Sequence, residues 1–189
     1  MYTPRVELAL ATVLEAHGLR RRKAGRGYEV THVTSVALIT ADYGCDEDTV
    51  IAALLHDTLE DTTLDPQVIR SRFGDLVLGM VRDVSEPSKP RPWRARKEAY
   101  IEQLRRTPRL GSLAIASADK IHNLTKMVDG LHAEGLRFAG AFTAGLDAMQ
   151  WYHHTVYELA AARWSHPILD EHRRRMDAFD AAAHDIQSA

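Results

Sequence analysis

The chain has 189 residues, a formal net charge of −2 at pH 7 and 45% hydrophobic residues. This composition supports a full apolar core and excludes a largely disordered chain, and the length suits one domain. The balanced charge does not indicate a nucleic-acid-binding protein, and no apolar run approaches the roughly 18 residues of a membrane span. The single cysteine, Cys45, excludes a disulfide framework and a zinc site built on thiolates.

The N-terminal segment does not have the layout of a signal peptide, so a cytoplasmic protein is expected. The first predicted helix covers residues 4–17, where Thr3 can cap it, Pro4 suits its first turn and Gly18 can end it. Its apolar spacing predicts a buried stripe of Val6, Leu10, Val13 and Leu14.

Helical spacing continues from about residue 31 to 43, ended by Gly44, and a third helix is expected from Asp46 through "TVIAALLHDTL". Short helices follow in "LDPQVIRSRFG" and "DLVLGMVRDV", before the proline-rich loop "SEPSKPRP" at 85–92. The remaining helices are predicted at about 93–106, 109–129, 135–164 and 167–186.

No segment shows the alternation of a strand. The predicted fold class is therefore all-α, a compact bundle of about eight to ten helices. No linker divides the chain, so residues 1–189 are expected to form one domain, with 165–189 as a C-terminal packing helix.

The stretch "ALLHDTLED", residues 53–61, ends an apolar run in His56 and Asp57, followed by Glu60 and Asp61. Burying charges is costly unless they are paired or bind a metal. On one continuous helix the three carboxylates share a face, so a positive group is expected opposite them.

Two other segments place a polar residue beside an apolar helical run: His32 in "YEVTHVTSVAL" and Asp119 in "LAIASADKIHNL". Together with His56 and Asp57 they offer two imidazoles and two carboxylates, a donor set that suits Mn²⁺, Fe²⁺ or Zn²⁺. Four protein ligands leave positions open for water and substrate, which is typical of a catalytic metal site. Each motif is weak alone, and the combination carries the prediction.

The pattern resembles the HD-domain superfamily of metal-dependent phosphohydrolases. The stretch "DEDTVIAALLHDTLEDTTLDPQVIRSRFGDLVLGMVRDVS" and the motif "ADKIHNLTKM" look like the hydrolase domain of RelA/SpoT proteins. They look most like the stand-alone small alarmone hydrolases of the Mesh type. The resemblance covers roughly residues 17–130.

The resemblance implies hydrolysis of the 3′-diphosphate of (p)ppGpp to GDP or GTP and pyrophosphate, a reaction of the stringent response. It implies Mn²⁺ as the usual ion and a nucleotide as partner, without nucleic acid or membrane. Carried over to this sequence, the metal ligands are His32, His56, Asp57 and Asp119. The residues that position and activate water are Glu60 and Asp61, and the nucleotide contacts are Arg22, Lys23, Asn123 and Tyr152.

One segment departs from the family pattern: "GYEVTHV" stands where the family usually has Pro-Tyr-Ile-x-His-Pro. This departure keeps a second hypothesis open, an HD phosphohydrolase for another nucleotide such as ppApp, a dNTP, a nucleoside monophosphate or NADPH. A third is a regulatory module without activity, and a homo-oligomer is possible. Outside these motifs, Asp83, Glu86 and His153 are expected at the surface, and Lys120 is either a phosphate partner or solvated.

Overall fold

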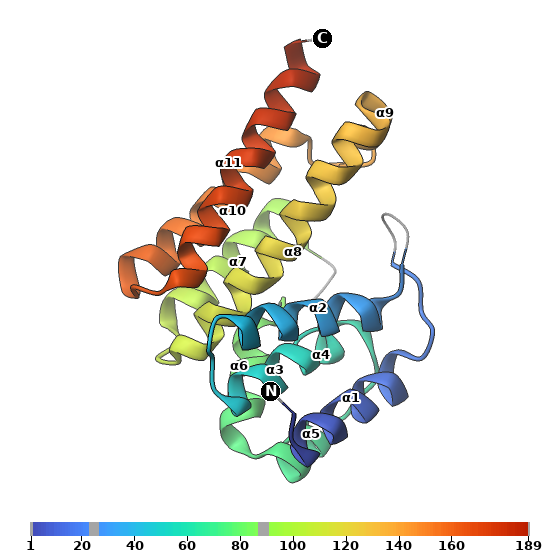
Figure 1. Cartoon of the computed structure of the whole chain (residues 1–189), viewed down its shortest axis with the longest axis vertical. Helices are drawn as coiled ribbons and strands as arrows, with labels where there is room; N and C mark the ends of the chain where they lie inside the picture. The colour runs from blue at the N-terminus through green and yellow to red at the C-terminus, as the bar shows by residue number, and fades with distance from the viewer. Residues whose placement is uncertain (1, 23–26, 87–90, 189) are drawn as a thin grey trace.

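The computed structural model describes residues 2–22, 27–86 and 91–188. Apart from one isolated bridge between Arg21 and Tyr28, the regular structure within these ranges is helical (Figure 1), which confirms the all-α prediction. The helices are α1 (Pro4–His17), α2 (Glu29–Asp42), α3 (Glu47–Leu55), α4 (Thr58–Asp61), α5 (Pro66–Phe73), α6 (Asp75–Val84), α7 (Trp93–Arg106), α8 (Leu110–Glu134), α9 (Leu136–Ala139), α10 (Leu146–Arg163) and α11 (Pro167–Ser188).

The first helix has the predicted ends, but its buried face differs from the predicted stripe. Thr3 accepts a hydrogen bond from the backbone N–H of Val6, and Gly18 ends α1 with φ +54°. Val6 and Val13 are buried, whereas Leu10 and Leu14 are 39% and 51% exposed. The buried face follows an i, i+3, i+7 spacing through Ala9, which turns the two leucines toward solvent.

The predicted third helix is broken at the most interesting point of the sequence. Helix α3 ends at Leu55, and α4 begins at Thr58 after a turn in which Asp57 has ψ −5°. Side chains bond to the last carbonyls of α3: His56 Nδ1 lies 2.8 Å from the oxygen of Ala53, and Thr58 Oγ1 donates to that of Leu55. A continuous helix here was a wrong prediction, because side chains compete with the backbone for these acceptors.

The predicted helix at 135–164 is also two helices. Helix α8 runs further than expected and ends at Gly135, with φ +54°, and α10 begins after Gly145, with φ +80°. Glycine adopts these positive φ values at little cost, so the two residues separate α8, α9 and α10.

Helix α8 is the axis of the molecule (Figure 1). Helices α2 and α3 pack against its first half, while α11 and α10 pack along it on the other side. The main core lies where α1, α2, α3, α6 and α8 meet, and a smaller apolar cluster joins the second half of α8 to α11. No helix in the described ranges is long and apolar enough to cross a membrane. The motif-bearing segments thus converge on the middle of α8.

Candidate metal centre and active site

Two buried histidines and an aspartate form a compact cluster between α2 and the α3–α4 turn. His32 and His56 are 2% and 3% exposed, and one potential ligand atom from each, with one from Asp57, lie within 4.8 Å of one another. His56 Nε2 is 3.1 Å from Asp57 Oδ1, yet this contact lacks hydrogen-bond geometry and the nitrogen has no hydrogen-bond partner among the described residues. A buried polar atom of this kind needs a partner, and a divalent cation would supply it.

Asp119 completes the donor set from the middle of α8. Its Oδ1 lies 3.2 Å from His32 Nε2 and 3.9 Å from His56 Nε2. Burial opposes ionisation of this carboxyl, but Lys120 and the two histidines outweigh it and hold the pKa of Asp119 well below its usual range. The structure therefore brings together all four residues expected to bind metal, with the carboxylate in the form that coordination requires.

The two imidazoles are oriented by different acceptors. His56 Nδ1 faces the carbonyl of Ala53, which can only accept, so Nδ1 donates and Nε2 is the ring atom turned toward the cluster. His32 Nδ1 lies 2.9 Å from His122 Nδ1. Burial, with His32 and Arg22 nearby, lowers the pKa of His122 to about 4, so His122 is neutral and can accept this proton. With Nδ1 occupied in this way on each ring, the Nε2 atoms are the ones that would coordinate a metal ion.

Glu60 and Asp61 border the same cavity from α4. Glu60 Oε2 accepts the backbone N–H of Glu86 at 3.2 Å, and Asp61 Oδ1 lies 3.7 Å from Arg20 Nη2. Burial first, then the charges of Glu86 and Asp57, raise the pKa of Glu60. Asp61, the neighbouring carboxylate on α4, adds a smaller contribution in the same direction.

A cavity of about 880 Å³ opens from this cluster, and three predicted nucleotide contacts line it: Arg22, Asn123 and Tyr152. Arg22 Nη2 donates to Asn123 Oδ1 at 3.2 Å, and Asn123 Nδ2 donates to Asp119 Oδ1 at 2.6 Å. Arg22 Nη1 is buried without a hydrogen-bond partner among the described residues. Lys23, the fourth predicted contact, lies outside the described residues.

Two lysines line the cavity as well. Lys120 is 5% exposed, its Nζ lies 2.5 Å from Asp119 Oδ2, and it sits over the ring of Tyr152 at 5.0 Å, so the solvated alternative is wrong. Lys97 Nζ lies 4.6 Å from the centre of the same ring. No motif in the predicted helix at 93–106 distinguished Lys97 from the other charges there.

Two residues expected at the surface also border the cavity. The Glu86 side chain is 10% exposed and binds Arg96, at 2.6 Å, and Lys97, both on α7. His153 is 2% exposed. Burial and the charge of Lys120 lower its pKa well below the usual range. These surface predictions were wrong, since both residues face inward in the fold and not outward.

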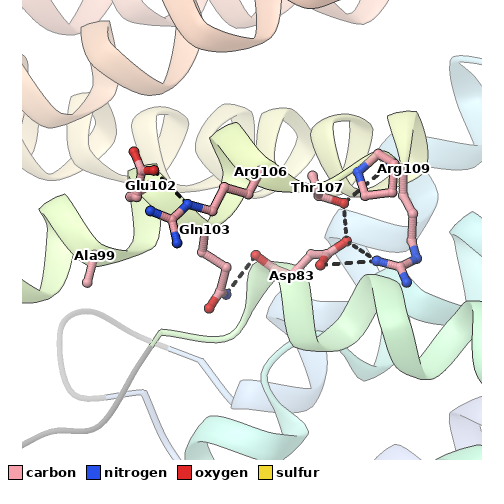
Figure 2. A pocket seen from close by; sticks show the side chains of 8 residues that line it. Asp83, Ala99, Glu102, Gln103, Arg106, Thr107 and Arg109 are labelled. Atoms are coloured by element: carbon pink, nitrogen blue, oxygen red, sulfur yellow. Dashed lines mark hydrogen bonds and ion pairs between the residues drawn. The ribbon is translucent and has the colours of Figure 1, made fainter.

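Asp83, also expected to be solvated, is held at the junction of α6, α7 and α8. Its side chain is 15% exposed and accepts hydrogen bonds from Thr107 and Arg109 (Figure 2) and from Ser112. This carboxylate is fully engaged in joining helices. It lies beside a separate hollow and not on the active-site cavity.

Apolar side chains also line the active-site cavity. They are Met127 from α8, Phe138 and Phe142 around α9, and Met149 from α10, and the same part of α8 contributes Lys126, Asp129 and Glu134. The two phenylalanine rings meet edge to face with centroids 5.2 Å apart. The cavity thus combines charged groups around the histidines with aromatic side chains that suit a planar ring.

Comparisons with known proteins agree with this geometry. A family model described as "HD domain" matches residues 9–139, which include all four expected ligands. Residues of this chain are 43% identical over 84 positions to an Aquifex aeolicus protein named guanosine-3′,5′-bis(diphosphate) 3′-pyrophosphohydrolase, covering 44% of this chain and 12% of the relative. They are 34% identical over 125 positions to the Escherichia coli bifunctional (p)ppGpp synthase/hydrolase SpoT, covering 64% and 18%. The chain thus spans less than a fifth of these relatives.

Two solved structures have the same fold over most of the chain. One, described as a metazoan ortholog of SpoT that hydrolyses ppGpp, has a TM-score of 0.76 at 24% identity and covers 96% of both chains. The other, from Listeria monocytogenes, has a TM-score of 0.70 at 34% identity and covers 77% of this chain and 96% of its own. With the family model matching over the whole segment that carries the metal centre, this chain belongs to the HD domain family.

Proposed function

We propose that this chain hydrolyses the 3′-diphosphate of (p)ppGpp, releasing pyrophosphate and leaving GDP or GTP. The observation that carries the proposal is that one cavity is bordered by the histidine–aspartate cluster, by the Glu60–Asp61 pair and by Arg22. Metal-binding donors, a base for water and a phosphate-binding cation are the three parts that such a hydrolysis needs. The names of the relatives from Aquifex aeolicus and Escherichia coli support the same substrate.

His32, His56, Asp57 and Asp119 are the residues that would hold the ion, with Mn²⁺ as the proposed species and Fe²⁺ or Zn²⁺ as ions that suit the same donors. A divalent ion bound there supplies Lewis-acid stabilisation of phosphoryl charge and lowers the pKa of water. Lys120 keeps Asp119 ionised through its contact with Oδ2, while Oδ1 faces the histidines.

Glu60 is proposed to accept the proton of the attacking water. A carboxylate whose pKa is raised by burial is a stronger base than a solvated one, and Glu60 has that environment. Asp61, next to it on α4, would orient the water. The contact of Arg20 with Asp61 ties this carboxylate to the segment that carries Arg22.

Arg22 and Asn123 are proposed to hold the nucleotide. The buried Nη1 of Arg22 is a donor suited to a phosphate oxygen, and the Nη2 bond to Asn123 fixes the guanidinium plane. Tyr152 would form part of the cavity wall, and Lys23, next to Arg22 in the sequence, would add positive charge. The aromatic side chains that line the cavity, Phe138 and Phe142, would receive the base.

A second candidate is the same chemistry on another nucleotide, such as ppApp, a dNTP, a nucleoside monophosphate or NADPH. It is favoured by Met127, Phe138 and Phe142, which line the cavity and offer surfaces on which any purine can stack. The altered segment before His32 also leaves Tyr28 packed against Arg21, with the guanidinium 5.0 Å from the ring centre.

The deciding experiment measures pyrophosphate release from ppGpp with Mn²⁺, beside a chelated control and a panel of GTP, dGTP, AMP and ppApp. Metal-dependent release from ppGpp supports the first proposal. Turnover of a panel member alone would replace the substrate but keep the chemistry. Metal binding without turnover of any nucleotide would favour a regulatory module and overturn the enzymatic proposal.

The proposal treats residues 1–189 as one hydrolase domain, because α11 packs along α8 beside the segment matched by the family model. The C-terminal helix at 165–189 would then support α8 from behind the site. We further propose a cytoplasmic location, where nucleotide substrates are found, and a homo-oligomer as a possibility for sedimentation analysis to decide.

A further inference from the structure

The turn after α6 is held from the side by Gln103 of α7. Gln103 Nε2 lies 2.7, 2.9 and 2.8 Å from the carbonyl oxygens of Arg82, Asp83 and Ser85 (Figure 2 shows the amide directed at Asp83). Carbonyls at the end of a helix lack the N–H partners of a following turn, and here the two N–H bonds of one amide are shared among three carbonyls, of which that of Arg82 also accepts the Ser85 N–H. Gln103 therefore closes the C-terminus of α6.

The side chain of Asp83 fastens the same helix end a second time. It accepts from Arg109 Nη1 at 3.0 Å and from Thr107 Oγ1 (Figure 2), and from Ser112 Oγ at 2.7 Å. Backbone and side chain at the end of α6 are thus both attached to the α7–α8 junction. A segment held by this many directed bonds has little freedom to shift.

The fixed turn leads directly to Glu86, whose backbone N–H donates to Glu60 Oε2 at 3.2 Å. The Glu86 carboxylate is bound by Arg96 and Lys97 of α7. Helix α7 consequently holds the chain on both sides of this N–H, with Gln103 before it and the two cations after it. The Glu86 N–H is thus a fixed backbone donor to the Glu60 carboxylate.

We propose that Gln103 is a positioning residue for the reaction, acting through the Ser85–Glu86 turn to aim the Glu86 N–H at Glu60. This inference rests on the proposed function, in which Glu60 accepts the proton of water. Gln103 borders the hollow on the outer side of α6 and α7 and not the active-site cavity, so its effect must pass through the backbone. Misplacing a reacting group by 1 Å can cost about 100-fold in rate, so a fixed donor on Glu60 matters.

The test is Gln103→Met, which keeps the length of the side chain and removes the amide. Pyrophosphate release from ppGpp should show kcat reduced by about 10- to 100-fold, with KM and the Mn²⁺ dissociation constant within about twofold of wild type. The matched control is Gln150→Met, which removes an amide bonded to Asp180 between α10 and α11 and should leave kcat unchanged. An unchanged kcat in Gln103→Met, or an equal loss in Gln150→Met, overturns the proposal.

A second pair of variants isolates the donor itself and does not depend on Gln103→Met folding. Glu86→Ala removes the carboxylate and keeps the N–H, whereas Glu86→Pro removes both, and Ser85 has ψ 128°, which a following proline accepts. The proline variant should have a kcat about 10-fold below that of the alanine variant. Equal kcat values would show that the N–H does not orient Glu60.

Amide hydrogen exchange of Glu86, followed by NMR, separates this proposal from the proposed function. If wild type does not act on ppGpp, the substrate assignment fails, and exchange alone decides the role of Gln103. Faster exchange of the Glu86 amide in Gln103→Met, by about 10-fold or more, supports the positioning role. Exchange equal to wild type overturns it.

Discussion

His172 of α11 is completely buried, and neither ring nitrogen has a hydrogen-bond partner among the described residues. Its ring packs edge to face on Tyr157 with centroids 5.5 Å apart. Burial, assisted by the charge of Lys120, lowers the pKa of His172 from 6.5 to about 3. The folded protein therefore keeps this imidazole neutral over the whole range in which the unfolded chain protonates it.

The sign and size of the effect follow from this difference. Below pH 6.5 the unfolded state binds one more proton than the folded state at His172, so stability falls as the pH falls, until the folded state also protonates near pH 3. Each pH unit is worth roughly 1.4 kcal/mol, and pH 5 lies about 1.5 units below the unfolded pKa, which amounts to a loss of about 2 kcal/mol from this residue.

The perturbation is His172→Met, which fills a similar volume and cannot protonate. Urea unfolding curves at pH 7, 6 and 5, in chelator so that metal binding does not contribute, should show wild type losing about 2 kcal/mol more than the variant between pH 7 and pH 5. His184→Met, an exposed histidine on the same helix, is the matched control and should follow wild type. Equal pH dependence in wild type and His172→Met would refute the reasoning.

Three further predictions concern the metal centre and the residues around it. Glu60→Gln should retain its Mn²⁺ affinity in calorimetry but lose about 10²- to 10⁴-fold in kcat, whereas Asp57→Asn should no longer bind the metal. Equal loss of metal in both variants would contradict the assignment of Glu60 as base and Asp57 as metal ligand. Excess chelator should lower the Tm of wild type by roughly 5 to 10 °C. This size follows because a ligand present at about 100 times its Kd contributes about 2.7 kcal/mol to the free energy of unfolding. An unchanged Tm would argue against a buried metal site. His122→Phe removes the acceptor for His32 Nδ1 and should weaken Mn²⁺ binding by about 10- to 100-fold; unaltered affinity would mean that His32 needs no such partner.

Helix ends were predictable because their causes are local. Thr3 and Gly18 end α1 as expected, and Asp65 caps α5 through the N–H of Gln67. Each of these signals acts within about four residues. The same local rules misplaced the third helix, because the imidazole of His56 and the hydroxyl of Thr58 take carbonyls that a backbone N–H would otherwise use.

The sequence by itself determined the all-α class and the kinds of donor at the metal centre, since the spacing of apolar residues and the residue types can be read directly from it. Tertiary structure alone decided what those donors face. His122 meets His32 across 90 residues of sequence, and Glu86 reaches Glu60 across 26. It also decided that Lys120, Glu86 and His153 point inward, although short-range pattern placed two of them outside. Burial and pairing arise from contacts between segments that only the folded chain brings together, and no local periodicity encodes them.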